Sequence, residues 1–134
     1  MPHRLPLALL SLRFSIFVVM LAWTIDKFAR PAHAIGVYEK FYGIDSVNRL
    51  GMYSLAVAEL LLLFAFVLGI KRHLCYGLVL ALHAVSTFSS WRQYLDPFTG
   101  NNLLFFAAWP MLAACLTLYL MRDQDTLLTL RRWR

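Results

Sequence analysis

Hydrophobic residues dominate four long segments of this 134-residue chain, and charged residues fall mostly between them. A helix needs about 20 predominantly apolar residues to cross a hydrocarbon core of about 30 Å. The segments that satisfy this length are residues 5–28, 47–70, 74–95 and 101–121. The pattern therefore predicts an all-α fold, an integral membrane four-helix bundle. We expect one transmembrane domain over residues 1–134, with residues 122–134 as a cytoplasmic C-terminal tail.

The connection between the first two spans, residues 29–46, is too apolar for an open loop. Ile35, Tyr38 and Tyr42 recur at helical spacing within it, which is typical of a helix with one apolar face. Pro31 stands at its start, and Gly43 is a residue type that commonly ends a helix. We therefore predict a short interfacial or re-entrant helix between helices 1 and 2, lying on the outer side of the membrane.

Composition supports the membrane class, because 60% of the residues are hydrophobic and a soluble domain of this length could not bury that much apolar surface. The net charge of +6 would suit nucleic acid, but the basic residues flank the apolar runs instead of forming one patch. Lys71–His73 and the arginines from Arg122 onward mark the cytoplasmic side under the positive-inside rule. The prediction is a multi-pass protein with both termini cytoplasmic, partnered by membrane lipids and not by nucleic acid.

A cleaved signal peptide ending at Ala32–Ala34 is the competing interpretation of the N-terminus. Arg13 would lie inside its apolar region, and Asp26, Lys27 and Arg30 would lie just before the cleavage point. These charges favour a first membrane span instead.

Glu59 lies in the middle of the second span and is its only charge beyond Arg49 until Lys71. A carboxylate at that depth costs about 3 kcal/mol on insertion scales. Each surrounding Leu, Phe, Val or Ile returns about 0.3–0.6 kcal/mol, so the span should still insert. Glu59 then needs a buried partner, a proton or a water-filled cavity.

Depth along the helices gives Glu59 a predicted neighbour, because His83 is halfway along the third span. His83, Thr87, Ser90 and Tyr94 share one helical face. The predicted intramembrane polar site is Glu59, His83, Arg13 and Arg92, with an outer mouth of Asp26, Lys27 and Thr24. Arg13 either extends to the cytoplasmic headgroups or turns inward as a counter-charge. The site would suit proton transfer or hydrogen bonding to a quinone, and a purely structural hydrogen bond between helices is the alternative.

Metal and disulfide chemistry are disfavoured by residue placement. His83 is the only histidine inside a predicted span, whereas a haem clamped in a helix bundle usually takes two. Cys75 and Cys115 form no CxxC motif and are expected to be small packing residues. We predict no metal site, and a quinone is the one candidate cofactor.

Three stretches carry a family resemblance: Leu12-Arg13 with Asp26-Lys27-Phe28, the apolar segment 35–44, and Ala58–Leu62 continuing to Leu68–Arg72. On these the chain resembles the DoxX/DoxD-like proteins, small four-helix proteins of bacterial inner membranes. The resemblance covers about residues 12–95, and its matched polar positions are Arg13, Lys27, Glu59 and Arg72. It implies a bacterial inner-membrane location and an association with redox systems, including quinone-linked oxidation. Cysteines typical of the family's maturation branch are missing from this chain.

Two functional hypotheses follow. The first is a small membrane subunit of a respiratory or redox-associated complex, with a Glu59-centred pocket for quinone or proton handling. Alone it would not be an enzyme, so other membrane or periplasmic subunits are expected partners. The alternative is a non-catalytic scaffold or assembly subunit, with a small-molecule transporter subunit as a weaker third choice because no inverted repeat relates the two halves.

Overall fold

The computed structural model describes residues 3–130, and within that range it is helical with no strand. Four longer helices and several short ones follow one another along the chain. They are α1 (Arg4–Ala29), α2 (Pro31–Tyr42), α3 (Arg49–Val67), α4 (Arg72–Ser89), α5 (Trp91–Leu95), the 3-10 helix η1 (Asn102–Ala107), α6 (Ala108–Leu120) and the 3-10 helix η2 (Arg122–Gln124). The all-α prediction is confirmed.

Three segments are long and apolar enough to cross a membrane: α1, α3 and the continuous stretch Asn102–Leu120. The third predicted span, residues 74–95, is not one helix. It is divided into α4 and α5 at Ser90, where the backbone leaves helical geometry. The hydroxyls of Ser89 and Ser90 bond the carbonyls of Val85 and Ser86. Such bonds compete with the helical backbone pattern and explain why α4 ends here.

The short helix expected between the first two spans is present as α2. Pro31 occupies its first turn, where its missing N–H would have no helical partner. Gly43 ends it with φ of 67°, a left-handed conformation that glycine adopts without steric cost. Asn48 then caps α3, its side chain accepting a 2.7 Å hydrogen bond from the Gly51 N–H.

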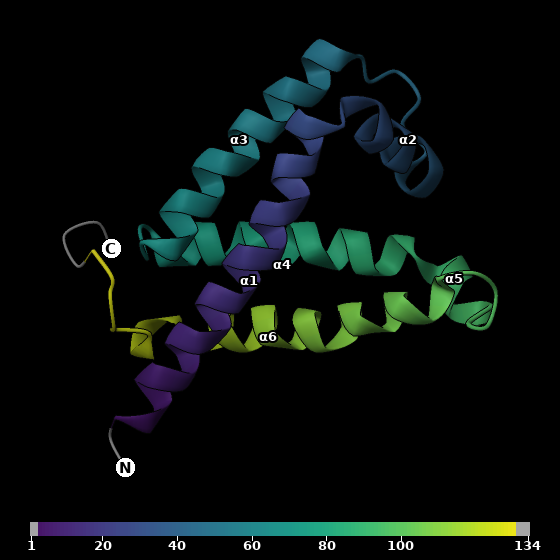
Figure 1. Cartoon of the computed structure of the whole chain (residues 1–134). Helices are drawn as coiled ribbons and strands as arrows, with labels where there is room; N and C mark the ends of the chain where they lie inside the picture. The colour runs from purple at the N-terminus through teal and green to yellow at the C-terminus, as the bar shows by residue number, and fades with distance from the viewer. Residues whose placement is uncertain (1–2, 131–134) are drawn as a thin grey trace.

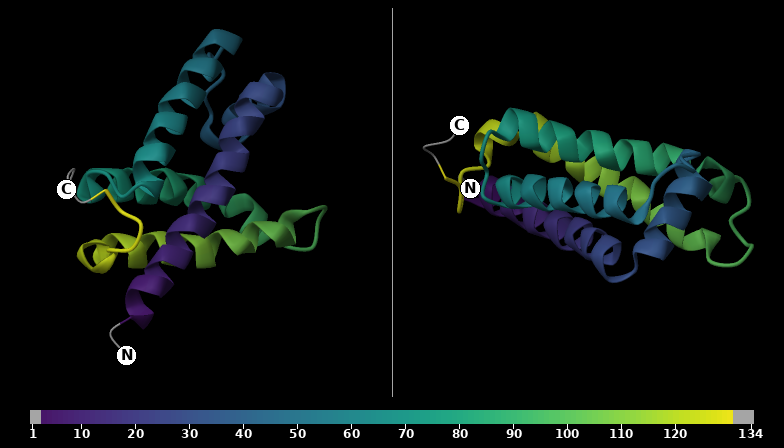
Figure 2. Two further views of the ribbon diagram at one scale, coloured as in Figure 1. Left: turned by 60° about the vertical axis from the view of Figure 1, so that its left-hand side comes forward. Right: turned by 90° about the horizontal axis from the view of Figure 1, so that it is seen from above.

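The four longer helices are arranged as two pairs, α1 with α3 and α4 with α6, which cross obliquely (Figure 1). Both further views show the same two pairs, and they place the two ends of the described chain at one side of the molecule (Figure 2). From the short turn that joins them, α3 and α4 diverge toward the opposite side. There α2 packs against α1, α3 and α4. This divergence leaves room for a cavity among these four helices.

The hydrophobic core fills the region where the pairs cross, with contributions from all four longer helices. Its buried residues are Leu9, Ile16, Met20, Leu63, Phe66, Cys75, Tyr76, Val79, Cys115 and Leu118. Both cysteines are free and buried. Outside this core many large apolar side chains face outward, including Leu61, Val85 and Leu120 at 58–68% exposure. Such a surface is far more apolar than that of an ordinary soluble monomer.

Pro110 falls within the fourth predicted span, residues 101–121. It lies in the first turn of α6, directly after η1, where a proline removes no α-helical hydrogen bond. The segment accordingly changes from 3-10 to α-helix at Ala108 instead of bending in its middle.

Candidate functional site

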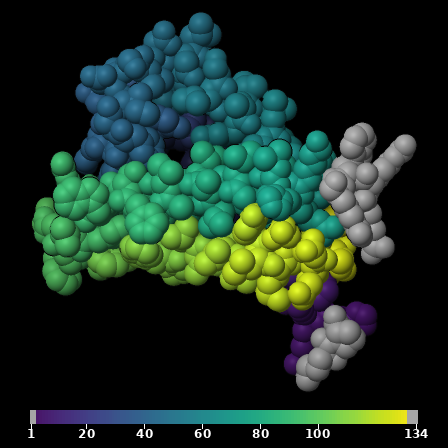
Figure 3. Space-filling model, turned by 180° about the vertical axis from the view of Figure 1, so that it is seen from behind, coloured from purple at the N-terminus to yellow at the C-terminus, as the bar shows by residue number. Residues whose placement is uncertain are grey.

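The main cavity, which we name the head cavity, has a volume of about 730 Å³ and lies where α3 and α4 diverge. Seen from behind, it is a hollow above α4 between α2 and α3, with α1 at its floor (Figure 3). Most of its wall is apolar or aromatic, including Trp23, Tyr38, Phe41, Tyr42 and Phe105. The polar groups in the wall come from Asp26, Lys27, His33, Glu59, His83 and three serines of α4.

Glu59 forms an ion pair with Lys27 in the wall of this cavity. The Lys27 ammonium lies 2.8 Å from Glu59 Oε2, with only 10% and 17% of the two side chains exposed. The Thr24 hydroxyl lies 3.1 Å from the same oxygen. Lys27 and Thr24 are one turn apart on α1, so one face of that helix presents both groups to α3. The pair provides the carboxylate with the partner that its depth required, and both of these contacts are made to Oε2.

Tyr38 reaches the same pair from α2. Burial and the nearby Glu59 carboxylate raise the pKa of Tyr38 to about 12, since both disfavour the phenolate. The Lys27 ammonium also lies 5.9 Å from the centre of the Tyr38 ring. Tyr38 therefore presents a protonated hydroxyl to the cavity at neutral pH.

His83 lines the head cavity with Glu59, but its hydrogen bond goes elsewhere. Its Nε2 lies 3.0 Å from the Ala108 carbonyl oxygen, and because a carbonyl only accepts, Nε2 carries the hydrogen. In the neutral ring Nδ1 is then an acceptor, and this buried nitrogen has no hydrogen-bond partner among residues 3–130. The Trp23 indole stacks on the ring with centroids 6.0 Å apart. The imidazole is thus held in place with one free acceptor.

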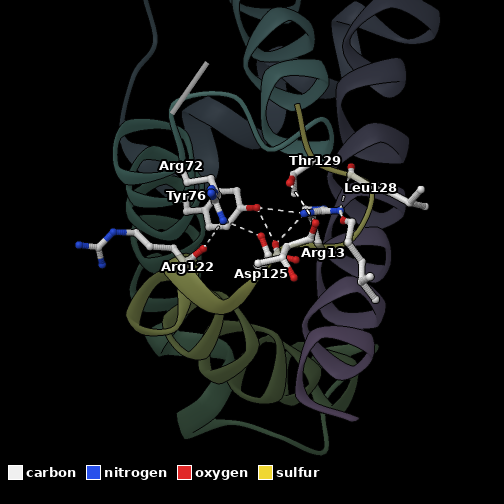
Figure 4. A network of polar contacts seen from close by, with 9 residues as sticks. Arg13, Arg72, Tyr76, Arg122, Asp125, Leu128 and Thr129 are labelled. Carbon is white, nitrogen blue, oxygen red and sulfur yellow. Dashed lines mark hydrogen bonds and ion pairs between the residues drawn. The ribbon is translucent and has the colours of Figure 1, made fainter. Parts of the chain in front are cut away.

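A second polar cluster lies at the opposite end of the bundle, around Arg13 (Figure 4). Arg13 is fully buried, and its Nη1 lies 2.7 Å from Oδ2 of Asp125, which is also fully buried. The Tyr76 hydroxyl donates to the same oxygen at 2.6 Å. Arg13 Nη2 donates to the carbonyls of Leu127 and Leu128 at 2.6 and 3.3 Å. This cluster holds residues 122–130, which we name the C-terminal strap, against the bundle.

Arg72 and the α3–α4 turn also bind the C-terminal strap. Arg72 Nη1 donates to the carbonyls of Arg122 and Asp125 at 2.7 and 2.6 Å. Further along, the Leu130 N–H donates to the Leu68 carbonyl at 2.9 Å. Gly69, next to it, has φ of 70° and lies directly under Thr129. Residues 122–130 of the predicted C-terminal tail are therefore packed against the bundle.

The structure separates the four residues of the predicted intramembrane site. Glu59 and His83 share the head cavity, whereas Arg13 belongs to the strap cluster and is not a counter-charge to Glu59. Arg92 is exposed on α5 with its guanidinium 5.2 Å from the Trp91 ring, so its inclusion in the interior was wrong. The two helix pairs cross obliquely and do not run parallel. Residues halfway along different helices are therefore not brought into contact by their depth alone.

The predicted outer mouth lies at the head cavity, but its residues differ in their contacts. Thr24 and Lys27 contact Glu59 directly. Asp26 also lines the cavity, yet it pairs with Arg30 at 2.6 Å and with His33 at 2.7 Å. The hydroxyls of Thr87 and Ser90 bond carbonyls within α4 and do not extend a polar path.

Three residues of these sites were missed from the sequence: Asp125, Tyr76 and Trp23. Asp125 was assigned to the tail because basic residues surround that region. The signal that could have identified it is the apolar run Leu127-Leu128-Thr129-Leu130, which is unusual for a solvated tail. Tyr76 and Trp23 look like ordinary aromatic residues of apolar helices, and only their contacts distinguish them.

Comparison with protein-family models, curated proteins and solved structures gave no match for this chain. Across residues 3–130, no group of three or more His, Cys, Asp or Glu side chains is arranged to hold a metal ion. The head cavity and its polar groups are the features of the structure that bear most directly on function.

Proposed function

We propose that this protein is a small membrane subunit of a redox-associated complex and binds a quinone-class molecule in the head cavity. The observation that carries the proposal is the Lys27–Glu59 ion pair in the wall of an otherwise largely apolar and aromatic cavity. Small-molecule sites typically have volumes of about 300–1,000 Å³ and a few polar groups in an apolar lining. The head cavity has this character.

The polar groups suit both redox forms of such a ligand. A quinone carbonyl accepts hydrogen bonds, and the Lys27 ammonium has donors beyond the one directed at Glu59. A quinol hydroxyl donates, and the Glu59 carboxylate can accept from it. His83 Nδ1, which has no hydrogen-bond partner among residues 3–130, is a second acceptor. Glu59 can also exchange a proton with a bound quinol. Electrons would come from a redox centre in a partner subunit, as the resemblance to DoxX/DoxD-like proteins implies.

The proposal includes a location. We infer that α1, α3, α4 and α6 lie in the bacterial inner membrane with both termini cytoplasmic. Three of these segments have the required length and hydropathy. The fourth, α4, exposes Leu74 and Leu78 at 56% and 44%, where lipid would contact them. The basic residues Arg4, Lys71 and Arg122 then lie on the cytoplasmic side.

Binding is tested by titrating the purified protein in lipid nanodiscs with a tailless benzoquinone and following quenching of tryptophan fluorescence, since Trp23 lines the cavity. We expect saturable quenching in the wild type. Glu59→Gln should weaken binding by about tenfold, equivalent to about 1.4 kcal/mol for one charge-assisted hydrogen bond. Glu39→Gln is the matched control, because Glu39 is exposed on α2 and outside the cavity lining.

A second variant covers the risk that Glu59→Gln leaves Lys27 buried without its partner. The double substitution Lys27→Met with Glu59→Leu removes the ion pair and keeps an apolar wall, an exchange that proteins often tolerate. It should fold and lose quinone binding. If the wild type shows no saturable quenching, or if this double variant binds as the wild type does, the pocket function is wrong. The scaffold alternative predicts that the variants change only the amount of protein in the membrane.

A further inference from the structure

A second cavity, which we name the tail cavity, adjoins the head cavity on the side of α6. Its volume is about 590 Å³, and it lies between α1, α4 and the η1–α6 segment. Its wall is more uniformly apolar than that of the head cavity. Leu12, Ile16 and Val19 contribute from α1, and Leu104, Met111 and Ala114 from η1 and α6. Outside the wall shared with the head cavity, Ser15 is its one polar lining residue.

The two cavities meet at a common wall. Trp23, His83, Ser86, Ser90 and Phe105 line both of them. The Trp23–His83 stack is the centre of this wall, with an interplanar angle of 19°. The His83 hydrogen bond to Ala108 ties the wall to the start of α6. A molecule with its polar part beside His83 in the head cavity would therefore lie next to the tail cavity.

We propose that the tail cavity receives the linear apolar tail of the same molecule whose ring occupies the head cavity. This proposal rests on the proposed function and narrows it: the ligand is an isoprenoid or alkyl quinone held by ring and tail. We place one molecule across both cavities because the same five residues line both of them. The polar groups of the head cavity and the apolar lining of the tail cavity therefore lie next to each other. An empty apolar cavity lacks packing contacts, and a hydrocarbon chain supplies them.

The effect of the tail on affinity must be separated from its effect on partitioning, since a longer tail concentrates a quinone in the lipid. Dissociation constants are therefore measured in nanodiscs and expressed as mole fraction in the lipid. On this scale a decyl-substituted quinone should bind the wild type about tenfold more tightly than the tailless quinone. A ratio near one would overturn the proposal, while saturable, Glu59-dependent binding of the tailless compound would leave the proposed function intact.

Matched substitutions on α1 locate the tail. Val19 lines the tail cavity and not the head cavity, whereas its neighbour Val18 lines neither and is 60% exposed. Val19→Phe should fill the cavity and reduce the affinity for the decyl quinone to that of the tailless quinone. Val18→Phe should change neither affinity. Ala107→Leu, on the opposite wall, is a second filling variant with an exposed starting side chain.

The competing occupant is the acyl chain of a membrane phospholipid. It predicts that Val19→Phe and Ala107→Leu lower the amount of tightly bound phospholipid but leave the ratio of decyl to tailless affinity unchanged. That result would overturn the proposal. Loss of the ratio in both filling variants, with tailless binding retained, would support it.

Discussion

Separating Arg13 from Asp125 should be among the most damaging single changes in this protein. The two charged groups lie 2.7 Å apart with no exposure of either side chain. Substituting Asp125→Leu leaves the Arg13 guanidinium buried without a counter-charge and deprives Tyr76 of its acceptor. Removing one member of a buried pair typically costs about 3–5 kcal/mol. We expect a loss in that range for Asp125→Leu and for Arg13→Met.

The double variant separates a coupled pair from two independent contributions. Replacing both members of a buried ion pair by apolar residues is often neutral or stabilising. Here the Leu127 and Leu128 carbonyls also lose the Arg13 donor, and leaving such groups unpaired costs about 1–3 kcal/mol. Arg13→Met with Asp125→Leu should therefore cost about 1–3 kcal/mol in total, well below the sum of the two single substitutions.

The assay is unfolding of the purified protein in mixed micelles by increasing detergent denaturant, followed by far-ultraviolet circular dichroism. Arg30→Met is the control, because the Arg30–Asp26 pair is equally short at 2.6 Å but the Arg30 side chain is 65% exposed. An exposed pair contributes about 0–1 kcal/mol. Single losses at Arg13 or Asp125 no larger than this control, or a double variant equal to the sum of the singles, would refute the reasoning.

Two further predictions concern the strap and the head cavity. Gly69→Ala places a methyl group 2.7 Å from Thr129 Cγ2, whereas Gly43, with a similar φ of 67°, has nothing within 4 Å. Gly69→Ala should therefore destabilise more than Gly43→Ala and speed proteolysis of the strap; equal effects would mean that the strap is not seated there. Because the pKa of Tyr38 is raised from 10.0 to about 12, its stabilising contribution is complete below pH 10 and is lost as pH rises toward 12. The phenolate absorbance present in wild type and missing in Tyr38→Phe should appear near pH 12. Its appearance near pH 10 would contradict the burial of Tyr38 beside Glu59.

Most helices were predictable because the length of the apolar segments and a few residues that begin or end helices determine them. Pro31, Gly43 and Asn48 stand at the boundaries of α2 and α3 as their backbone preferences require. The break at Ser90 was not predicted. The length of an apolar segment gives no information on serine hydroxyls that donate hydrogen bonds to carbonyls of the preceding turn.

The need of Glu59 for a partner was predictable from the cost of a buried carboxylate, but the identity of that partner was not. Depth along antiparallel helices pointed to His83 and Arg13. Lys27 instead reaches Glu59 within the α1–α3 pair, and the oblique crossing of the two pairs leaves a cavity between Glu59 and α4. Arg13 does turn inward, toward an acidic residue 112 positions away in sequence. Such long-range pairing depends on the packing of the helices, which no local pattern encodes.

The central claim is that the head cavity holds a quinone in the native membrane. The most direct measurement is the quinone content of protein purified gently from bacterial membranes, extracted with solvent and quantified per protein by mass spectrometry. The wild type and Glu39→Gln should carry quinone well above an unrelated membrane protein purified in parallel, and Lys27→Met with Glu59→Leu should retain about a tenth or less at equal yield. Equal quinone content in the wild type and this double variant, or none above the unrelated protein, would contradict the account.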